Sequence, residues 1–201
     1  MNKLAILLIT CLVWACSTPE KKAEGTEEPV EHTDHKHDTS TPKEEGKPNK
    51  SPRTASMAMI GDNHVHIDYS SPSMRGRQIF GGLVGYGEVW VTGAHKATNI
   101  KFDNDAMVGG INIPKGKYGL FTIPGKDQWT IIINKDWDMH LADDYNQSND
   151  IVRMVVDVEK SESAVESLTF EVATVDDTKG TVTIKWENTS VVFEVVNTNE
   201  E

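Results

Sequence analysis

Two histidines and an aspartate alternate with apolar residues in the short segment HVHID. In a β-strand, residues two apart project from one face about 7 Å apart, so His64 and His66 lie close enough to bind one metal ion. Asp68 continues that face, and two imidazoles with one carboxylate suit iron or zinc. One interpretation is a metal-dependent hydrolase with zinc or iron, completed by His95 or His140. We favour the alternative, a solvent-exposed strand face, because simple alternation produces the same pattern.

Two arginines flank a glycine within residues 69–83, the part of the chain that least resembles a strand. Guanidinium groups bind a carboxylate or sulfate through paired hydrogen bonds, so these arginines are candidates for holding an anionic ligand. The alternative is that they pair with acidic residues of their own fold. The next segment adds an indole, a hydroxyl and an imidazole. We therefore predict one ligand-binding cleft lined by Arg75, Arg77, Trp90, Thr92 and His95.

Four tryptophans lie beyond residue 50, at positions 90, 129, 137 and 186. Tryptophan is most often a core residue, and stacking on a sugar ring is the functional alternative. The chain contains no nucleophile elbow, phosphate-binding loop, zinc-protease helix motif or dinucleotide fingerprint. We assign no catalytic residue, and the sequence favours a binding module over an enzyme.

The N-terminus has the pattern of a lipoprotein signal. Lys3 precedes an apolar run at residues 4–13, and Cys16 follows the small residue Ala15. As a helix, ten apolar residues cover only about 15 Å of a hydrocarbon core that is roughly 30 Å thick. We predict a signal peptide over residues 1–15 and a lipid on Cys16. The protein is then anchored in the bacterial cell envelope, at the outer membrane.

Residues 16–50 are dominated by charged and small polar types, with almost no large apolar side chain. Such a segment cannot offset the entropy of ordering, so we expect a disordered tether with a reach of roughly 30 Å. It includes the sequence HTDHKHD at 32–38. These side chains could chelate a metal, but we interpret them as a solvated spacer because nothing here holds the ligands in place.

Charge and cysteine content narrow the classes of function. Residues 51–201 carry 13 basic and 22 acidic residues, a net charge of −9, and contain no cysteine. An acidic surface repels phosphate backbones, so nucleic-acid binding is disfavoured. Stability must come from a packed core rather than from disulfides.

Beyond residue 50 the sequence has short β-branched and aromatic runs separated by turn residues. This pattern predicts one all-β domain over residues 51–201, an antiparallel β-sandwich of nine or ten strands. We expect strands at 64–69, 88–91, 99–102, 118–123, 129–133, 152–156, 168–172, 181–186 and 191–195. Tight turns are predicted at 124–127 and 177–180. The long polar segment 139–149 is a candidate functional loop with a helical turn.

The domain also carries several longer motifs: SPR at 51–53, IDYS at 67–70, GR at 76–77, IFGGL at 79–83, VW at 89–90, TGA at 92–94 and YGLFTIPG at 118–125. Through them it resembles the family of domain of unknown function 2911. The resemblance implies a secreted or lipid-anchored bacterial domain and brings no activity with it. Val91 and the His95–Lys96 pair depart from the family's pattern, and His64 and His66 lie outside it.

Three hypotheses follow. The first is a non-catalytic lipoprotein that binds an envelope ligand or partner through the predicted cleft. The second is the metal-dependent hydrolase on His64, His66 and Asp68. The third is an architectural spacer of the envelope, kept soluble by its acidic surface.

Overall fold

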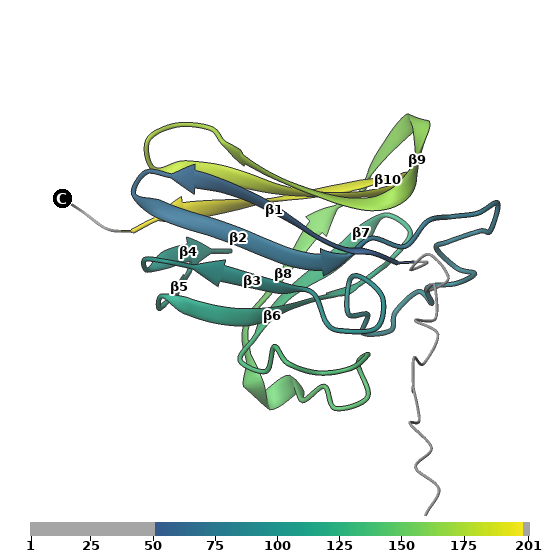
Figure 1. Ribbon diagram of the computed structural model, residues 1–201, viewed down its shortest axis with the longest axis horizontal. Helices are drawn as coiled ribbons and strands as arrows, with labels where there is room; N and C mark the ends of the chain where they lie inside the picture. Colours follow the sequence, from purple (N-terminus) through teal and green to yellow (C-terminus); the bar gives the residue numbers. More distant parts are fainter. Residues whose placement is uncertain (1–50, 199–201) are drawn as a thin grey trace, which may run out of the picture. The chain divides into compact units, whose positions relative to one another are not determined.

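The computed structural model describes residues 51–198, where the chain forms ten strands and one short 3₁₀ helix (Figure 1). The predicted signal peptide, the lipidation of Cys16 and the tether lie outside the described residues. The elements are β1 (Arg53–Ile60), β2 (Asn63–Ser70), β3 (Asn99–Phe102), β4 (Ala106–Val108), β5 (Ile111–Ile113), β6 (Gly116–Ile123), β7 (Gln128–Asn134), η1 (Gln147–Asn149), β8 (Asp150–Asp157), β9 (Glu159–Thr174) and β10 (Lys179–Asn197).

The strands form two antiparallel sheets. One has six strands in the order β1-β2-β3-β6-β7-β8, and the other has four in the order β5-β4-β10-β9. In Figure 1, β9 and β10 lie over β1 and β2, and the main chain of β9 reaches β1 where Val172 N donates to Ser56 Oγ at 3.0 Å. The all-β prediction with two packed antiparallel sheets is therefore confirmed. No helix within residues 51–198 is long and apolar enough to cross a membrane.

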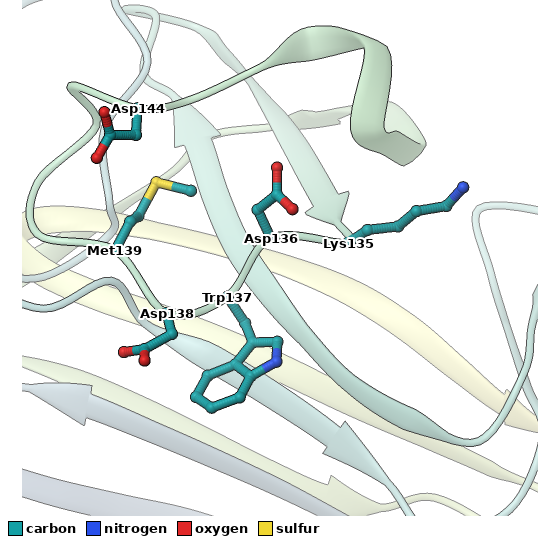
Figure 2. Close-up of a pocket in the computed structure, with 6 residues that line it drawn as sticks. All are labelled: Lys135, Asp136, Trp137, Asp138, Met139 and Asp144. Carbon is teal, nitrogen blue, oxygen red and sulfur yellow. The ribbon is translucent and has the colours of Figure 1, made fainter.

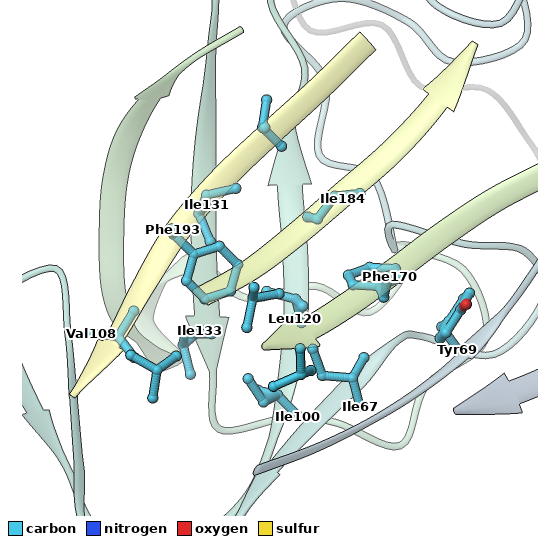
Figure 3. Packing of buried hydrophobic residues seen from close by; sticks show 14 of the residues in the cluster. Ile67, Tyr69, Ile100, Val108, Leu120, Ile131, Ile133, Phe170, Ile184 and Phe193 are labelled. Atoms are coloured by element: carbon cyan, nitrogen blue, oxygen red, sulfur yellow. The ribbon is translucent and has the colours of Figure 1, made fainter. Parts of the chain in front are cut away.

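The core lies between the sheets because alternate residues of each strand face inward. In β2, Val65 and Ile67 are fully buried, whereas the histidines and aspartate between them are half-buried on the outer face. Removing apolar surface from water supplies about 25 cal/mol per Å², the main drive for this packing. Figure 3 shows part of the core, including Ile67, Ile100, Leu120, Ile131 and Ile133 from the larger sheet and Phe170, Ile184 and Phe193 from the smaller one.

A cluster of large aromatic rings closes one part of this core. Trp129 and Trp186 are 2% and 1% exposed, and Phe80 packs against Trp129 with ring centroids 4.9 Å apart. Trp90 stacks on Trp186 at 5.9 Å with an interplanar angle of 18°. Trp129 and Trp186 are core residues and Trp90 is partly buried against them, so of the four considered for sugar stacking Trp137 is the most exposed, at 38%.

Several predicted strand boundaries differ from the structure. The runs at 181–186 and 191–195 belong to one 19-residue strand, β10. A bulge interrupts its periodicity, because the register shifts on both sides of Glu187, which has a φ of 56°. Residues 88–91 are not a strand but contribute a single bridge between Trp90 and Thr122. The helical turn expected within 139–149 is η1.

Candidate functional site

Three of the five predicted ligand-binding residues line one hollow. It has a volume of about 470 Å³, and we call it the arginine hollow; its walls are Ser51, Pro72, Arg75, Arg77, Leu83, Ala94 and His95. Residues 72–83 and residues 94–95 belong to separate loop segments. They meet at this hollow only because of the tertiary fold. The structure brings Arg75, Arg77 and His95 together around this hollow, and their binding of a ligand stays a prediction.

The first wall is a loop that is bound firmly to β9. Met74 N donates to the carbonyl of Glu166 at 2.8 Å, and Ser71 Oγ donates to the carbonyl of Leu168 at 2.7 Å. Farther along the loop, Ile79 and Phe80 are buried in the core. The arginines are thus presented by a segment that is anchored at both ends, and this reduces the entropy lost when a ligand binds.

The guanidinium group of Arg77 is held by neutral partners. Its Nε donates to the carbonyl of Met74 at 3.0 Å, and its Nη2 donates to the carbonyl of Ser73 at 2.8 Å. Nearby, the carboxylate of Glu166 accepts a hydrogen bond from the main-chain N of Arg75 at 2.9 Å. Carbonyl groups orient a guanidinium without neutralising it, so Arg77 keeps its positive charge beside the hollow.

The backbone around the arginine hollow is strained. Within residues 51–198, five non-glycine residues have positive φ, and four of them lie in this part of the molecule: Arg75 at 51°, Thr92 at 50°, His95 at 63° and Leu141 at 56°. The left-handed conformation costs roughly 1–2 kcal/mol for a residue with a Cβ. Leu141 N donates to the carbonyl of His95 at 2.7 Å, which joins the two loops at this point. Such strain collects at functional sites, where the surrounding structure holds it in place.

Trp90 and Thr92 are not part of the hollow's wall. Thr92 is fully buried, and its Oγ1 donates to Thr122 Oγ1 at 3.1 Å. Trp90 Nε1 donates to the carbonyl of Gly93 at 3.0 Å, and Thr98 Oγ1 donates to the carbonyl of Thr92 at 2.9 Å. These bonds fix the tight loop that carries His95. The structure therefore gives both residues a positioning role.

The two histidines of β2 have local acidic partners. His66 Nε2 lies 3.3 Å from Asp68 Oδ1, and His64 Nδ1 lies 3.6 Å from Asp103 Oδ2. The hydrogen bond from Lys101 lowers the pKa of the Asp103 carboxyl from its usual range.

The residues do not fit the metal centre considered as an alternative. In the described part of the chain, no three His, Cys, Asp or Glu side chains are grouped so that they could hold a metal ion. His95 does meet His140, with ring centroids 6.3 Å apart, but this is a second pair and does not complete the set on β2. The geometry thus supplies no ligand set for the hydrolase alternative on His64, His66 and Asp68.

Four residues of the arginine hollow were not predicted: Ser51, Pro72, Leu83 and Ala94. Leu83 is 51% exposed, which is unusual for a leucine at the end of a largely apolar motif. Its exposure depends on the turn from Gln78 to Val84, where Leu83 N donates to the carbonyl of Gln78 and Val84 N to that of Ile79. No periodicity in the sequence signals such a turn.

Comparison with known proteins adds one match. A family described as "Protein of unknown function (DUF2911)" covers residues 51–195, nearly all of the described chain. Neither the curated proteins nor the solved structures contain a match to the sequence. The match spans both walls of the arginine hollow and both sheets, and the chain therefore belongs to the DUF2911 family.

Proposed function

We propose that this protein is a lipid-anchored module of the bacterial cell envelope that binds a ligand with a carboxylate or sulfate group in the arginine hollow. The observation that carries the proposal is the meeting of Arg75, Arg77 and His95 around one hollow of about 470 Å³. Ligand pockets typically combine a few placed polar groups with apolar walls, and here Pro72, Leu83 and Ala94 supply the apolar part.

Charge supports an anionic ligand. The domain as a whole is acidic, with a net charge of −9 over residues 51–201. An arginine pair is therefore a local exception, and the neutral carbonyl partners of Arg77 leave its charge available. Paired guanidinium–carboxylate hydrogen bonds are roughly twice as strong as neutral ones and depend on direction, so they favour a planar anion over a simple counterion.

The envelope location in this proposal rests on the N-terminal sequence. The short apolar run before Cys16 suits cleavage and lipidation, and residues 16–50 provide a polar connection of sufficient length. A single acyl chain binds membranes weakly, and stable anchoring needs more than one chain, which a lipoprotein modification of Cys16 supplies.

The test is anion binding by the full chain, purified in detergent, with glutarate and sulfate as probes in titration calorimetry. We expect saturable binding that Arg77→Ala weakens at least tenfold, because the fork that faces the anion is lost. Arg77→Lys keeps the charge and should recover only part of the affinity.

The matched control is Lys126→Ala, which removes one positive charge from the exposed β6–β7 hairpin. Equal losses of anion affinity in Lys126→Ala and Arg77→Ala would mean that the effect comes from net charge alone. If neither probe binds the unmodified protein, the binding proposal fails and the architectural spacer becomes the better hypothesis.

A further inference from the structure

A second hollow lies on the outer face of the larger sheet. It has a volume of about 280 Å³, and we call it the tryptophan hollow; the residues that matter are Arg53, Asp68, Lys96, Asn99, Lys117 and Trp137. Its floor follows the sheet register, in which Asp68 on β2 pairs with Asn99 on β3, and Asn99 pairs with Gly119 on β6. Its size suits one small ring rather than an extended ligand.

The loop after β7 brings an indole over this floor. A Cβ on Gly119 would collide with the carbonyl oxygen of Asp136, so only glycine lets the loop pass this close to the sheet. Asp136 is held from both sides, since its N donates to Asn134 Oδ1 at 2.7 Å and its carboxylate accepts from Asn149 Nδ2 at 2.6 Å. The next residue, Trp137, is therefore fixed in position.

Trp137 presents its ring at the surface. It is 38% exposed, the most exposed tryptophan of the described chain, and Lys117 Nζ lies 4.3 Å from its ring centroid. Figure 2 shows the indole beside Asp136, Asp138 and Met139, with which it also lines an adjoining hollow. The lysine restrains the ring by a cation–π contact. An exposed, restrained indole is a platform for stacking rather than a core residue.

The floor contains a buried acceptor without a donor. Asn99 is only 5% exposed, and its Oδ1 has no hydrogen-bond partner within residues 51–198. Buried side-chain oxygens in native proteins nearly always accept a hydrogen bond, so each exception calls for an explanation. A ligand hydroxyl that enters the tryptophan hollow is a donor of the right kind for this amide.

The charges around the hollow are mixed, with Asp68 and Asp138 beside Lys96, Lys117 and Arg53, so they suit a ligand that both donates and accepts hydrogen bonds. Lys117 Nζ lies 4.0 Å from Asp68 Oδ2, and Lys96 Nζ lies 3.8 Å from Asp138 Oδ1, so each lysine has an acid beside it. An anion entering here meets carboxylates, and a cation meets ammonium groups. A hydroxyl group satisfies both kinds of partner, because it is a donor and an acceptor at once.

From these observations we propose that the tryptophan hollow binds one uncharged saccharide ring. The C–H face of the ring stacks on Trp137, and one ring hydroxyl donates a hydrogen bond to Asn99 Oδ1. The site is independent of the arginine hollow and of its proposed anion. Trp137 would supply the stacking surface, and the side chains of Asp68 and Lys117 would receive and donate hydrogen bonds at the ring's edge.

The experiment is saturation-transfer NMR of the full chain in detergent with four methyl glycosides as probes, those of glucose, galactose, mannose and N-acetylglucosamine. We expect at least one to bind, with an affinity that Trp137→Ala lowers at least tenfold. Asn99→Ala should lower it severalfold while the melting temperature stays the same or rises, because the amide oxygen has no partner to lose.

Tyr86→Ala is the matched control, since Tyr86 is 39% exposed and lies on another loop. It should leave glycoside binding unchanged. Failure of all four probes to bind the unmodified protein would overturn the proposal, as would unchanged binding in Trp137→Ala. Glucuronate serves as a fifth, charged probe. If only glucuronate binds, and its binding is lost in Arg77→Ala but kept in Trp137→Ala, the proposal is also overturned and the sugar is assigned to the arginine hollow.

Discussion

The outer face of β2 and the pair of loops that meet at His95 both carry histidines beside charged residues, yet they differ in structure. On β2 the histidines follow regular strand geometry, and each has an acid within 3.6 Å. In the loops, His95 has a φ of 63° and shares a hollow with two arginines. We call residues 71–98 and 135–149 together the loop end of the molecule.

The difference shows how strongly the backbone conformation determines which side chains can meet. A regular strand spaces its side chains evenly along a flat surface, so polar groups on it pair with neighbours or with water. Loops with left-handed residues can turn several side chains toward one space, at a cost that the rest of the fold must offset. A histidine on β2 is thus expected to be replaceable, whereas the loop end should respond strongly to substitution.

The largest expected effect concerns the aromatic support of the loop end. Trp90→Ala removes the stacking contact with Trp186 and the hydrogen bond to Gly93, and we expect the free energy of unfolding to fall by about 3 kcal/mol. His66→Ala, on the outer face of β2, should change it by less than about 0.5 kcal/mol. Urea denaturation followed by circular dichroism measures both, and similar losses in the two variants would contradict the comparison.

An intermediate effect is expected at Tyr145 in the second loop. Burial and the hydrogen bond to Asp150 raise the pKa of Tyr145 to about 12, and its hydroxyl donates to Asp150 Oδ2 at 2.6 Å. We expect Tyr145→Phe to lower the free energy of unfolding by about 1.5 kcal/mol at neutral pH, since a hydrogen bond to a charged group is lost.

The pH dependence of that loss tests its cause. Because the folded pKa is raised above the unfolded value of 10.0, the contribution of Tyr145 is complete below pH 10 and disappears as the pH rises toward about 12. Urea denaturation across this range should show Tyr145→Phe converging on the unmodified protein. His64→Ala, which removes an exposed pair on β2, should show no such convergence. A gap that stays constant to pH 12 would mean that ionisation of Tyr145 plays no part.

The smallest expected effect is a change in the free energy of unfolding that has opposite signs at His95, in the loop end, and at His66, on β2. His95→Gly should raise the free energy of unfolding by about 1 kcal/mol, because glycine adopts a φ of 63° without strain. His66→Gly should lower it by a similar amount, since glycine weakens a strand. The same denaturation measurement decides the matter. A loss in both variants would show that the imidazole of His95 stabilises the fold more than its backbone strains it.

The parts of the structure that could be predicted from the sequence are regular strands. Alternation in residues 64–69 and the apolar run at 129–133 correspond directly to β2 and β7, because inward and outward positions follow from strand period alone. The edge strand β1 was not predicted, since its exposed positions include the apolar Met57 and Met59 while the more buried Ser56 and Ala58 are small, the reverse of the usual polar-out alternation. Two of the five predicted cleft residues, Trp90 and Thr92, lie in the packing beneath the loop instead, because composition cannot distinguish a ring in a cleft from one in a core.

The amino-acid sequence by itself determined the fold class, the family and the polar alternation of β2, all of which depend on local pattern and motif. Tertiary structure alone decided which polar residues share a space. Arg75 reaches His95 only because the first loop is bound to β9, and Trp137 reaches Asn99 only because Gly119 lets a second loop cross the sheet. Both juxtapositions come from contacts between distant segments, and no local spacing encodes them.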